Sequence, residues 1–296
     1  MKPSKKPPPK KPGAGQDMHG ASLDSADDIL RNHIAGVVDD LRTELGDRLC
    51  AVILHGSLAM ESFHAPKSDV DLLVLVEDLS ADQARRLYSL FERHHSHRPY
   101  AGGLEVSVID AADAKSPQHP LPSLVHFSET TSGWQPWPEG KPPTDEDLLA
   151  HLTVARHRGR SLHGPAPRDA IGELPWADYL ASVRGDIDWI LEDENILGSP
   201  YYGILNLCRW AMMAEAAERI VPGKEEAGVW ALSHLPQDLR EIVAQALAAY
   251  RDRSWPQTIR ERQLSGGPWQ RTPLLEFRDY MRSRNGNREG AGTPTG

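Results

Sequence analysis

The stretch from residue 51 to residue 77 constrains the fold more than any other part of the chain, because two short apolar runs in it bracket a compact set of polar residues. The first run, residues 51–54, is short and β-branched enough to be a buried strand, and it ends at His55-Gly56-Ser57. The second run, residues 72–76, follows directly on Asp69-Val70-Asp71. The stretch therefore predicts two strands, with polar residues where the first ends and the second begins.

These polar residues suit the binding of phosphate and of a divalent cation. Gly56 would let the backbone approach a ligand closely, and Ser57 would stand at the start of a helix, where backbone amides attract phosphate. Successive side chains of a strand point to opposite faces, so Asp69 and Asp71 share a face. Two neighbouring carboxylates repel each other unless a cation lies between them. Their hard oxygen ligands suit Mg²⁺, which takes further ligands from water and substrate phosphates.

Neither motif is specific by itself, since Gly-Ser is usually a turn and Asp-x-Asp is commonly a solvated strand end. Their combination, in the order strand, Gly-Ser, Ser-Asp-x-Asp and second strand, is far more specific. In this order the stretch resembles the nucleotidyltransferase superfamily, whose signature is a Gly-Ser followed by an Asp-x-Asp on the next strand.

A third acidic residue is predicted to join the two aspartates. In the run at residues 104–109, Leu104, Val106 and Val108 alternate as a core face, which leaves Glu105 on the opposite face. If this run is the next strand of the sheet, Glu105 can face the same cleft as Asp69 and Asp71.

The chain has 296 residues, which is enough for two domains that each bury a core. We predict an α+β protein with a nucleotidyltransferase-type domain over residues 21–168, built on a mixed β-sheet with flanking helices. An all-α helical bundle domain is predicted to follow over residues 169–284, where helical patterns succeed one another without a strand. Residues 1–20, rich in Pro and Lys, and residues 285–296, rich in Gly and Thr, are predicted to be disordered tails.

Local signals predict where several elements begin and end. We expect the first helix to start with Ser25 as its N-cap, to bury a stripe that includes Ile29, and to end at Gly46. A second helix is expected to follow Ser80. Further helices are predicted at about residues 145–158, 175–195, 200–220, 224–234, 236–252 and 273–283.

Two segments read as irregular. Residues 110–145 are predicted to be a long loop with a short strand near residues 124–127. The glycines and prolines between Gly159 and Pro167 predict a linker between the two domains.

Charge and composition limit the partners and the location of the protein. Residues 1–12 carry five lysines and no acid, and subtracting their charge from the net −9 leaves −14 on the rest of the chain. A body this acidic repels a nucleic-acid backbone and attracts a polycationic small molecule. No run is apolar enough for a membrane span or a signal peptide, so we expect no membrane partner and a cytoplasmic location. We also expect a monomer.

A family becomes recognisable when the second half is taken with the first. The stretches LTVARHRGRSLHGPAP (152–167), LNLCRW (205–210) and IVPGKEEAGVWALSHLP (220–236) resemble the streptomycin/spectinomycin adenylyltransferases, which are bacterial aminoglycoside-resistance enzymes. The stretch LHGSLAMESFHAPKSDVDLLVLV, with LEVSVID after it, resembles the same family. The similarity spans about residues 30–255.

The resemblance implies that AMP is transferred from ATP to an antibiotic hydroxyl and that pyrophosphate is released. Such a reaction needs a metal to neutralise the triphosphate, donors to hold it, and a base for the hydroxyl proton. Asp69 and Asp71 would bind Mg²⁺, and Ser57 and Ser68 would contact phosphate oxygens. Glu105 would be either a third metal ligand or the general base, and we favour the base because the adenylyltransferase resemblance implies it.

The helical domain is expected to contribute to the same site. By resemblance, Lys224 would contact the triphosphate with Tyr250 beside it; the alternative is a solvated lysine and a packing tyrosine. ATP would then help to close the cleft between the domains before the antibiotic enters.

The candidate substrate contacts are Glu129, Trp134 and Asp186. Enzymes of the family that act on both drugs have an aromatic residue where this chain has Thr130, and an acidic residue where it has Gly198-Ser199. Both departures favour spectinomycin or a related aminocyclitol over streptomycin.

Two other functions remain open from the sequence. One is a nucleotidyltransferase that modifies a protein side chain or an RNA end, which the acidic body and the long helical domain disfavour. The other is a nucleotide-binding regulator without turnover, which the presence of all three carboxylates disfavours.

Overall fold

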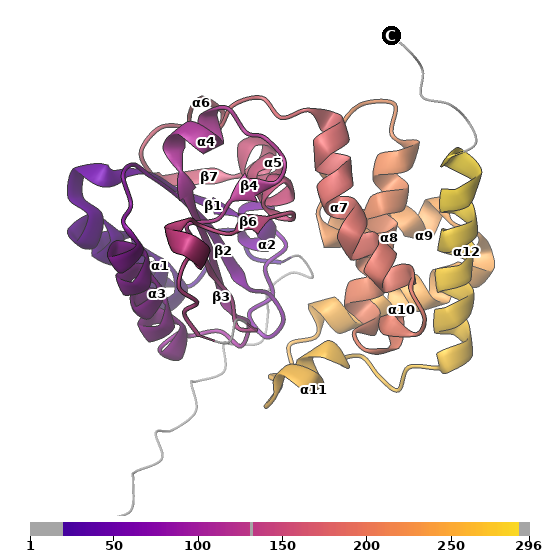
Figure 1. Cartoon of the computed structure of the whole chain (residues 1–296). Coiled ribbons are helices and arrows are strands. Elements are labelled where there is room, and N and C mark those ends of the chain that lie inside the picture. The colour runs from indigo at the N-terminus through magenta and orange to yellow at the C-terminus, as the bar shows by residue number, and fades with distance from the viewer. Residues whose placement is uncertain (1–19, 131–132, 290–296) are drawn as a thin grey trace, which may run out of the picture.

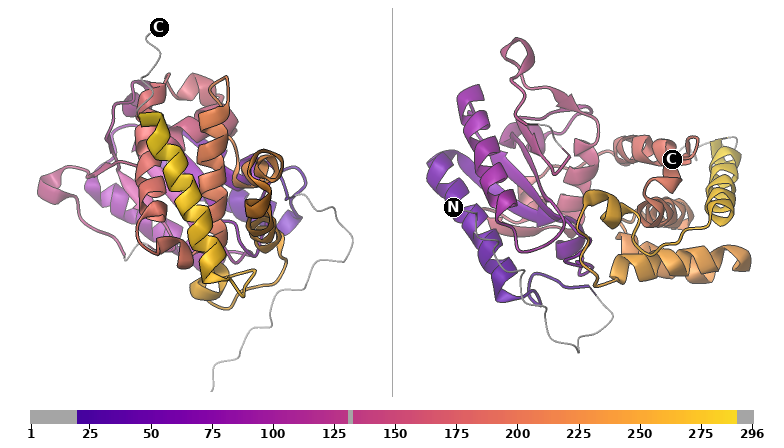
Figure 2. Two further views of the ribbon diagram at one scale, coloured as in Figure 1. Left: turned by 90° about the vertical axis from the view of Figure 1, so that its right-hand side faces the viewer. Right: turned by 90° about the horizontal axis from the view of Figure 1, so that it is seen from below.

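The computed structural model describes residues 20–130 and 133–289, and the predicted basic tail lies outside them except for Gly20. The chain forms a sheet-containing half, indigo to magenta in Figure 1, and an all-helical half, salmon to yellow, which lie side by side. Figure 2 shows the same arrangement from two further directions. The predicted α+β class, with a mixed sheet followed by a helical part, is confirmed.

The central sheet has five strands in the order β5-β3-β2-β1-β7. Strands β2 and β3 are parallel, whereas β1–β2, β1–β7 and β3–β5 are antiparallel, so the sheet is mixed. The bounds of the strands are β1 Leu49–His55, β2 Val70–Val76, β3 Leu104–Asp110, β5 Val125–Phe127 and β7 Arg160–His163. A second sheet pairs β4 (Leu121–Pro122) with β6 (Thr144–Asp145).

Each face of the central sheet is covered by its own helices. On one face, every second residue of the strands is apolar, such as Val52 and Leu72, and packs against α1 (Asp28–Leu45) and α3 (Ala81–Ser96). The opposite face, with Ile53 and Leu73, packs against α4 (Ala111–Lys115) and α5 (Leu148–Arg158). Because successive side chains of a strand point to opposite faces, the polar residues at the strand ends are also divided between the two faces.

The first helix begins later than its sequence suggested. Its N-cap is Asp27, whose carboxylate accepts a hydrogen bond from Leu30 N at 2.8 Å, and not Ser25, which is bonded to Ser22 instead. This start turns Ile29 outward, where it is 66% exposed, so its assignment to the buried stripe was wrong. The predicted end at Gly46 and the N-cap at Ser80 are both confirmed.

The segment predicted as a linker contains the last strand of the sheet. Strand β7 pairs with β1 antiparallel, Ser161 opposite Ile53. After it, α6 (Pro167–Ala170) leads to Ile171, which is buried in the same core as α5. The boundary between the core of the sheet half and the helical half therefore lies after Ile171 and before the next helix.

The helical half has its own apolar core, formed mainly by α8, α9, α10 and α12. Its helices are α7 Trp176–Leu191, α8 Pro200–Glu215, α9 Lys224–His234, α10 Arg240–Arg251, α11 Ile259–Gln263 and α12 Arg271–Glu289. Helix α12 lies on the side away from the sheet (Figure 2) and includes residues 285–289, which had been assigned to the tail. Within the described ranges, none of the helices combines the length and apolarity that crossing a membrane requires.

Candidate active site

The three predicted carboxylates come together at the edge of the sheet that faces the helical half. In the parallel pair β2–β3, Asp71 lies directly opposite Glu105, so the two side chains share a face. Asp69 precedes β2 by one residue, and its Oδ1 accepts a hydrogen bond from Gly103 N just before β3. Its side chain remains 39% exposed. The predicted proximity of Glu105 to the aspartates thus follows from the register of one strand pair.

The electrostatics of this group favour a cation. Burial raises the pKa of Asp71 well above its ordinary range, and the charges of Glu105 and Asp69 raise it further. Burial also raises the pKa of Asp69, against the opposing charge of Arg262. In the described residues, no three His, Cys, Asp or Glu side chains are grouped so that they could hold a metal ion by themselves. Asp69 and Asp71 supply hard oxygen ligands of the kind that Mg²⁺ prefers, and Mg²⁺ commonly takes its further ligands from substrate phosphates and water.

The Gly56-Ser57 corner lies directly against Asp71. Gly56 has φ +64°, and a Cβ at this position would overlap the Asp71 carboxylate, so both the backbone conformation and the space require glycine. The Ser57 backbone N–H lies close enough to Asp71 to lower the pKa of that carboxyl group, although burial outweighs this effect. Ser57 Oγ is buried and has no hydrogen-bonding partner of normal geometry in the described part of the chain. An unsatisfied buried hydroxyl of this kind fits a phosphate oxygen.

Lys224, the first residue of α9, brings a positive charge from the helical half. Burial and the charge of Arg209 lower the pKa of Lys224, whereas the charges of Asp69 and Asp71 raise it. The carboxylates of the sheet half and this ammonium group therefore act on one another across the boundary between the halves.

Ser68 and Tyr250 are also brought together from the two halves. The Tyr250 hydroxyl lies 3.2 Å from Ser68 Oγ and donates to Ser62 O at 3.0 Å. Burial raises the pKa of Tyr250 to about 12, so its hydroxyl stays a neutral donor. Tyr250 therefore holds the segment that leads into Asp69.

The three candidate substrate residues lie in different surroundings. Asp186 on α7 accepts a hydrogen bond of 2.6 Å from Tyr202, whose ring centroid lies 4.7 Å from Lys224 Nζ. Trp134 packs near Tyr88 on α3, against the core on the face of the sheet that α1 and α3 cover, which is opposite to the face of Asp71 and Glu105. Glu129 forms ion pairs with two arginines, described below. Of the three, only Asp186 shares a neighbour with the candidate phosphate-binding lysine.

Sequence reasoning missed several residues at this site. His151 on α5 has Nδ1 3.7 Å from Glu105 Oε1, and the His55 ring packs edge-on against the His151 ring at 5.5 Å. Burial lowers the pKa of His55 to about 3, with the charge of His151 as the second cause. Arg209 stands within the family-like run LNLCRW, which could have drawn attention to it. Arg262 lies in a segment that carried no signal.

A buried ion-pair cluster fastens α9 to the sheet half beside Lys224. Glu225 Oε2 lies 3.0 Å from His64 Nε2, and Arg251 Nε donates to Glu225 Oε1 at 2.6 Å. Burial alone would raise the pKa of Glu225, but the hydrogen bonds from His64 and Arg251 outweigh it, and the net pKa is lowered. Glu225 therefore links the two halves as a carboxylate.

We expect Glu225→Gln to lower the free energy of unfolding by about 2 kcal/mol at neutral pH, because one charged partner of a buried, hydrogen-bonded cluster is lost. A carboxyl group with a lowered folded pKa contributes stability above its unfolded pKa, and that stability is lost as the pH falls through the folded value. The unfolding curves of wild type and variant should therefore converge as the pH falls below 4.5, the ordinary value for this group. Glu241→Gln, on the exposed first turn of α10, serves as the control.

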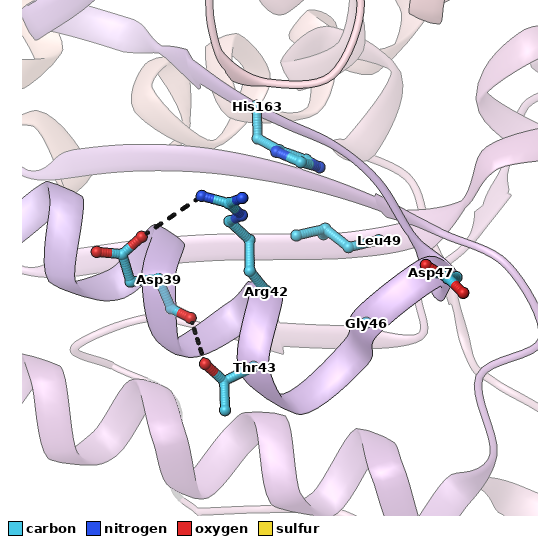
Figure 3. A pocket seen from close by; sticks show the side chains of 7 residues that line it. All are labelled: Asp39, Arg42, Thr43, Gly46, Asp47, Leu49 and His163. Carbon is cyan, nitrogen blue, oxygen red and sulfur yellow. Dashed lines mark hydrogen bonds and ion pairs between the residues drawn. The ribbon is translucent and has the colours of Figure 1, made fainter.

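A hollow of about 710 Å³ lies elsewhere, at the end of α1. Figure 3 shows its lining, in which Arg42 pairs with Asp39 near Leu49 and His163. It contains none of the predicted site residues, so we do not assign the chemistry to it.

The chain is similar in sequence to known adenylyltransferases. Residues 170–265 match the family described as aminoglycoside adenylyltransferase, C-terminal domain. An aminoglycoside (3'') (9) adenylyltransferase of Klebsiella pneumoniae is 27% identical over 241 residues, which cover 75% of this chain and 85% of that protein. A spectinomycin 9-adenylyltransferase of Staphylococcus aureus (strain Mu50) is 27% identical over 222 residues, which cover 73% and 82%.

The fold is shared with a solved structure. The crystal structure of a spectinomycin adenyltransferase from Enterococcus faecialis with ATP and spectinomycin matches with a TM-score of 0.66 and 19% sequence identity. The match covers 85% of this chain and 99% of that one. The sequence matches run through both halves, and the family match covers the segment that carries Lys224 and Tyr250. The chain is therefore similar in sequence to aminoglycoside and spectinomycin adenylyltransferases over about three quarters of its length, and it shares the fold of one of them.

Proposed function

We propose that this protein is an ATP-dependent adenylyltransferase that transfers AMP to a hydroxyl group of a cationic antibiotic of the spectinomycin class and so confers resistance. The observation that carries the proposal is the pairing of Asp71 and Glu105 on one face of the sheet, opposite Lys224 of the helical half. The relatives named above are adenylyltransferases, and the solved relative was crystallised with ATP and spectinomycin.

This arrangement supplies groups that would hold the metal and the triphosphate of ATP. Asp69 and Asp71 would hold Mg²⁺, which neutralises phosphate charge and polarises the α-phosphorus when it is bound. Lys224 would supply a further positive charge, and the buried Ser57 hydroxyl would supply a hydrogen bond at the Gly-Ser corner. Tyr250 contributes through Ser68, which it orients, since its own hydroxyl is already bonded within the protein.

Glu105 is the proposed general base. It shares a face with Asp71 and keeps 27% of its side chain accessible, so an incoming hydroxyl can reach it. The base takes the hydroxyl proton as the oxygen attacks the α-phosphorus, and pyrophosphate leaves on the opposite side. His151, 3.7 Å away, limits the directions in which the carboxylate can turn.

The proposed substrate is cationic because further acidic groups lie near Glu105. Asp186 and Glu105 both raise the pKa of Tyr202, after burial, so all three lie around one region. An ammonium group of the substrate would be attracted there. We also retain cytoplasmic location and a monomeric state as parts of the proposal, since ATP is the co-substrate and no second copy is needed to complete the site.

A single labelling experiment tests the function. The full-length protein is incubated with [α-³²P]ATP, Mg²⁺ and a panel of spectinomycin, streptomycin, other aminoglycosides, RNA and mixed proteins. We expect spectinomycin to become labelled, with release of pyrophosphate. Label on RNA or on protein would favour a different nucleotidyltransferase, and ATP binding without any labelled product would favour a regulator.

A further inference from the structure

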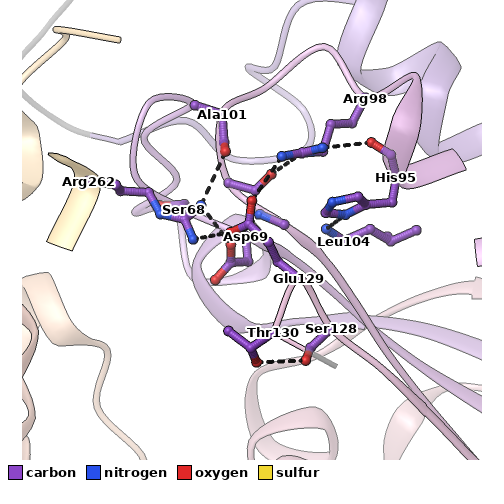
Figure 4. A network of polar contacts seen from close by, with 12 residues as sticks. Ser68, Asp69, His95, Arg98, Ala101, Leu104, Ser128, Glu129, Thr130 and Arg262 are labelled. Carbon is purple, nitrogen blue, oxygen red and sulfur yellow. Dashed lines mark hydrogen bonds and ion pairs between the residues drawn. The ribbon is translucent and has the colours of Figure 1, made fainter. Parts of the chain in front are cut away.

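An arginine from the helical half reaches into the metal-binding edge of the sheet half. Arg262 lies on α11, which extends toward the sheet half in Figure 1, and its side chain is only 12% exposed. One of its nitrogens donates to Ala101 O at 3.2 Å and lies 3.5 Å from Asp69 Oδ1, while the other pairs with Glu129 Oε2. Figure 4 shows these contacts.

Glu129, which pairs with Arg262, is also held by a second arginine. Glu129 Oε1 accepts a hydrogen bond of 3.0 Å from Arg98, and Glu129 Oε2 accepts one from Arg262, so each carboxylate oxygen has its own guanidinium group. The Glu129 side chain is 15% exposed. A carboxylate paired in this way has little capacity left for an ammonium group of a substrate.

The same network fixes one oxygen of Asp69. Gly103 N donates to Asp69 Oδ1, and Arg262 approaches the same oxygen. Gly103 follows Ala101 and Gly102, whose carbonyl oxygens accept from Arg262 and Arg98 respectively. The turn that presents Gly103 N is therefore fastened by two arginines, and Asp69 Oδ2 is left without these partners.

We propose that Arg262 is a positioning residue, which bridges Glu129, Ala101 and Asp69 and thereby holds the Asp69 carboxylate in the orientation from which it binds the catalytic metal. The inference rests on the proposed function, since it assumes that Asp69 is a metal ligand. It assigns Glu129 to the support of Asp69 and not to substrate binding. Hydrogen-bonded partners behind a metal ligand commonly fix its orientation and contribute to metal affinity.

The shape of the guanidinium group matters more here than its charge. A planar fork can serve Glu129 on one side and Ala101 and Asp69 on the other, whereas a lysine ammonium is a point charge on a flexible stem. Replacement by lysine keeps the charge next to Asp69 and removes the bridge. The charge-conserving variant therefore separates orientation from electrostatic attraction.

The test measures metal binding in the nucleotide-free, full-length protein. Binding of Mn²⁺ is measured from the electron paramagnetic resonance signal of the free ion. We expect Arg262→Lys to weaken Mn²⁺ binding by about tenfold and to leave the thermal unfolding midpoint unchanged. Arg260→Lys is the matched control, because Arg260 lies on the same helix, is exposed and donates to Gly198 O. Glu129→Gln, which removes the main acceptor of Arg262, is expected to act in the same direction.

A second measurement does not depend on the metal. Hydrogen exchange of the Gly103 amide, which donates to Asp69, is expected to be about tenfold faster in Arg262→Lys than in Arg260→Lys. Mn²⁺ affinity within twofold of the wild type would overturn the proposal, and tighter binding would show that Arg262 competes with the metal. If the wild type binds no Mn²⁺, the proposed metal site is wrong, and the exchange rate alone decides whether Arg262 braces Asp69.

Discussion

Replacing Glu105 with glutamine is expected to lower kcat by a factor of about 10²–10⁴ while leaving the dissociation constant of ATP nearly unchanged. Glutamine has the size of glutamate but cannot take up the hydroxyl proton. Because Glu105 keeps 27% of its side chain accessible and lies opposite Asp71, the substitution leaves the strand pair and its core intact. The measurement is steady-state AMP transfer, together with equilibrium binding of ATP.

The same variant separates the two roles considered for this carboxylate. If Glu105 is a metal ligand, the Mg²⁺ concentration that gives half-maximal activity should rise in Glu105→Gln; if it is the base, that concentration should stay constant. Glu77→Gln, at the exposed far end of β2, is the control for a general loss of negative charge. Turnover of Glu105→Gln at the wild-type rate would remove the assignment of the base.

Asp71→Asn is expected to reduce activity by about a thousandfold or more, because a metal contributes several kcal/mol of transition-state stabilisation and each 1.36 kcal/mol is a factor of ten. The ligand-free variant should nevertheless unfold at a higher temperature than the wild type. Asp71 is a partly buried carboxylate that neighbouring Glu105 and Asp69 repel, and asparagine removes that repulsion while keeping the size of the side chain.

These opposite changes are measured on one protein preparation, by AMP transfer across a Mg²⁺ series and by differential scanning calorimetry without ligands. Asp78→Asn is the control, since Asp78 is exposed just beyond β2. A variant that loses activity together with stability would indicate a folding defect, and Asp71 would then have no special place in the chemistry.

The central part of the site could be predicted from the sequence because strand geometry determines it. Once residues 70–76 and 104–110 are neighbouring parallel strands, the alternation of side chains decides that Asp71 and Glu105 share a face. The Gly-Ser corner followed from the same order of motifs. The contributions of Lys224 and Tyr250 came from resemblance to the family, since no periodicity relates them to the sheet.

Other contacts could not be predicted because they depend on how the halves pack. Arg262 and Asp69 are separated by 193 positions, and α11 is too short to give a periodic apolar pattern. Strand β7 was taken for a linker because it is short, half-exposed and flanked by glycine and proline. The N-cap of α1 was misplaced because Ser and Asp are both good N-cap residues. What distinguishes Asp27 from Ser25 is the hydrogen bond that the Leu30 backbone N–H donates to it in the structure.

Strand β7 also protects the molecule against self-association. It covers the backbone of β1, whose residues are almost all buried and apolar, so without it a long hydrophobic edge would face solvent. A fragment cut at Gly159 would expose that edge to other chains, whereas a fragment that continues through Ile171 keeps it paired. The few residues that lead out of the sheet thus replace a long apolar edge with a short and more exposed one.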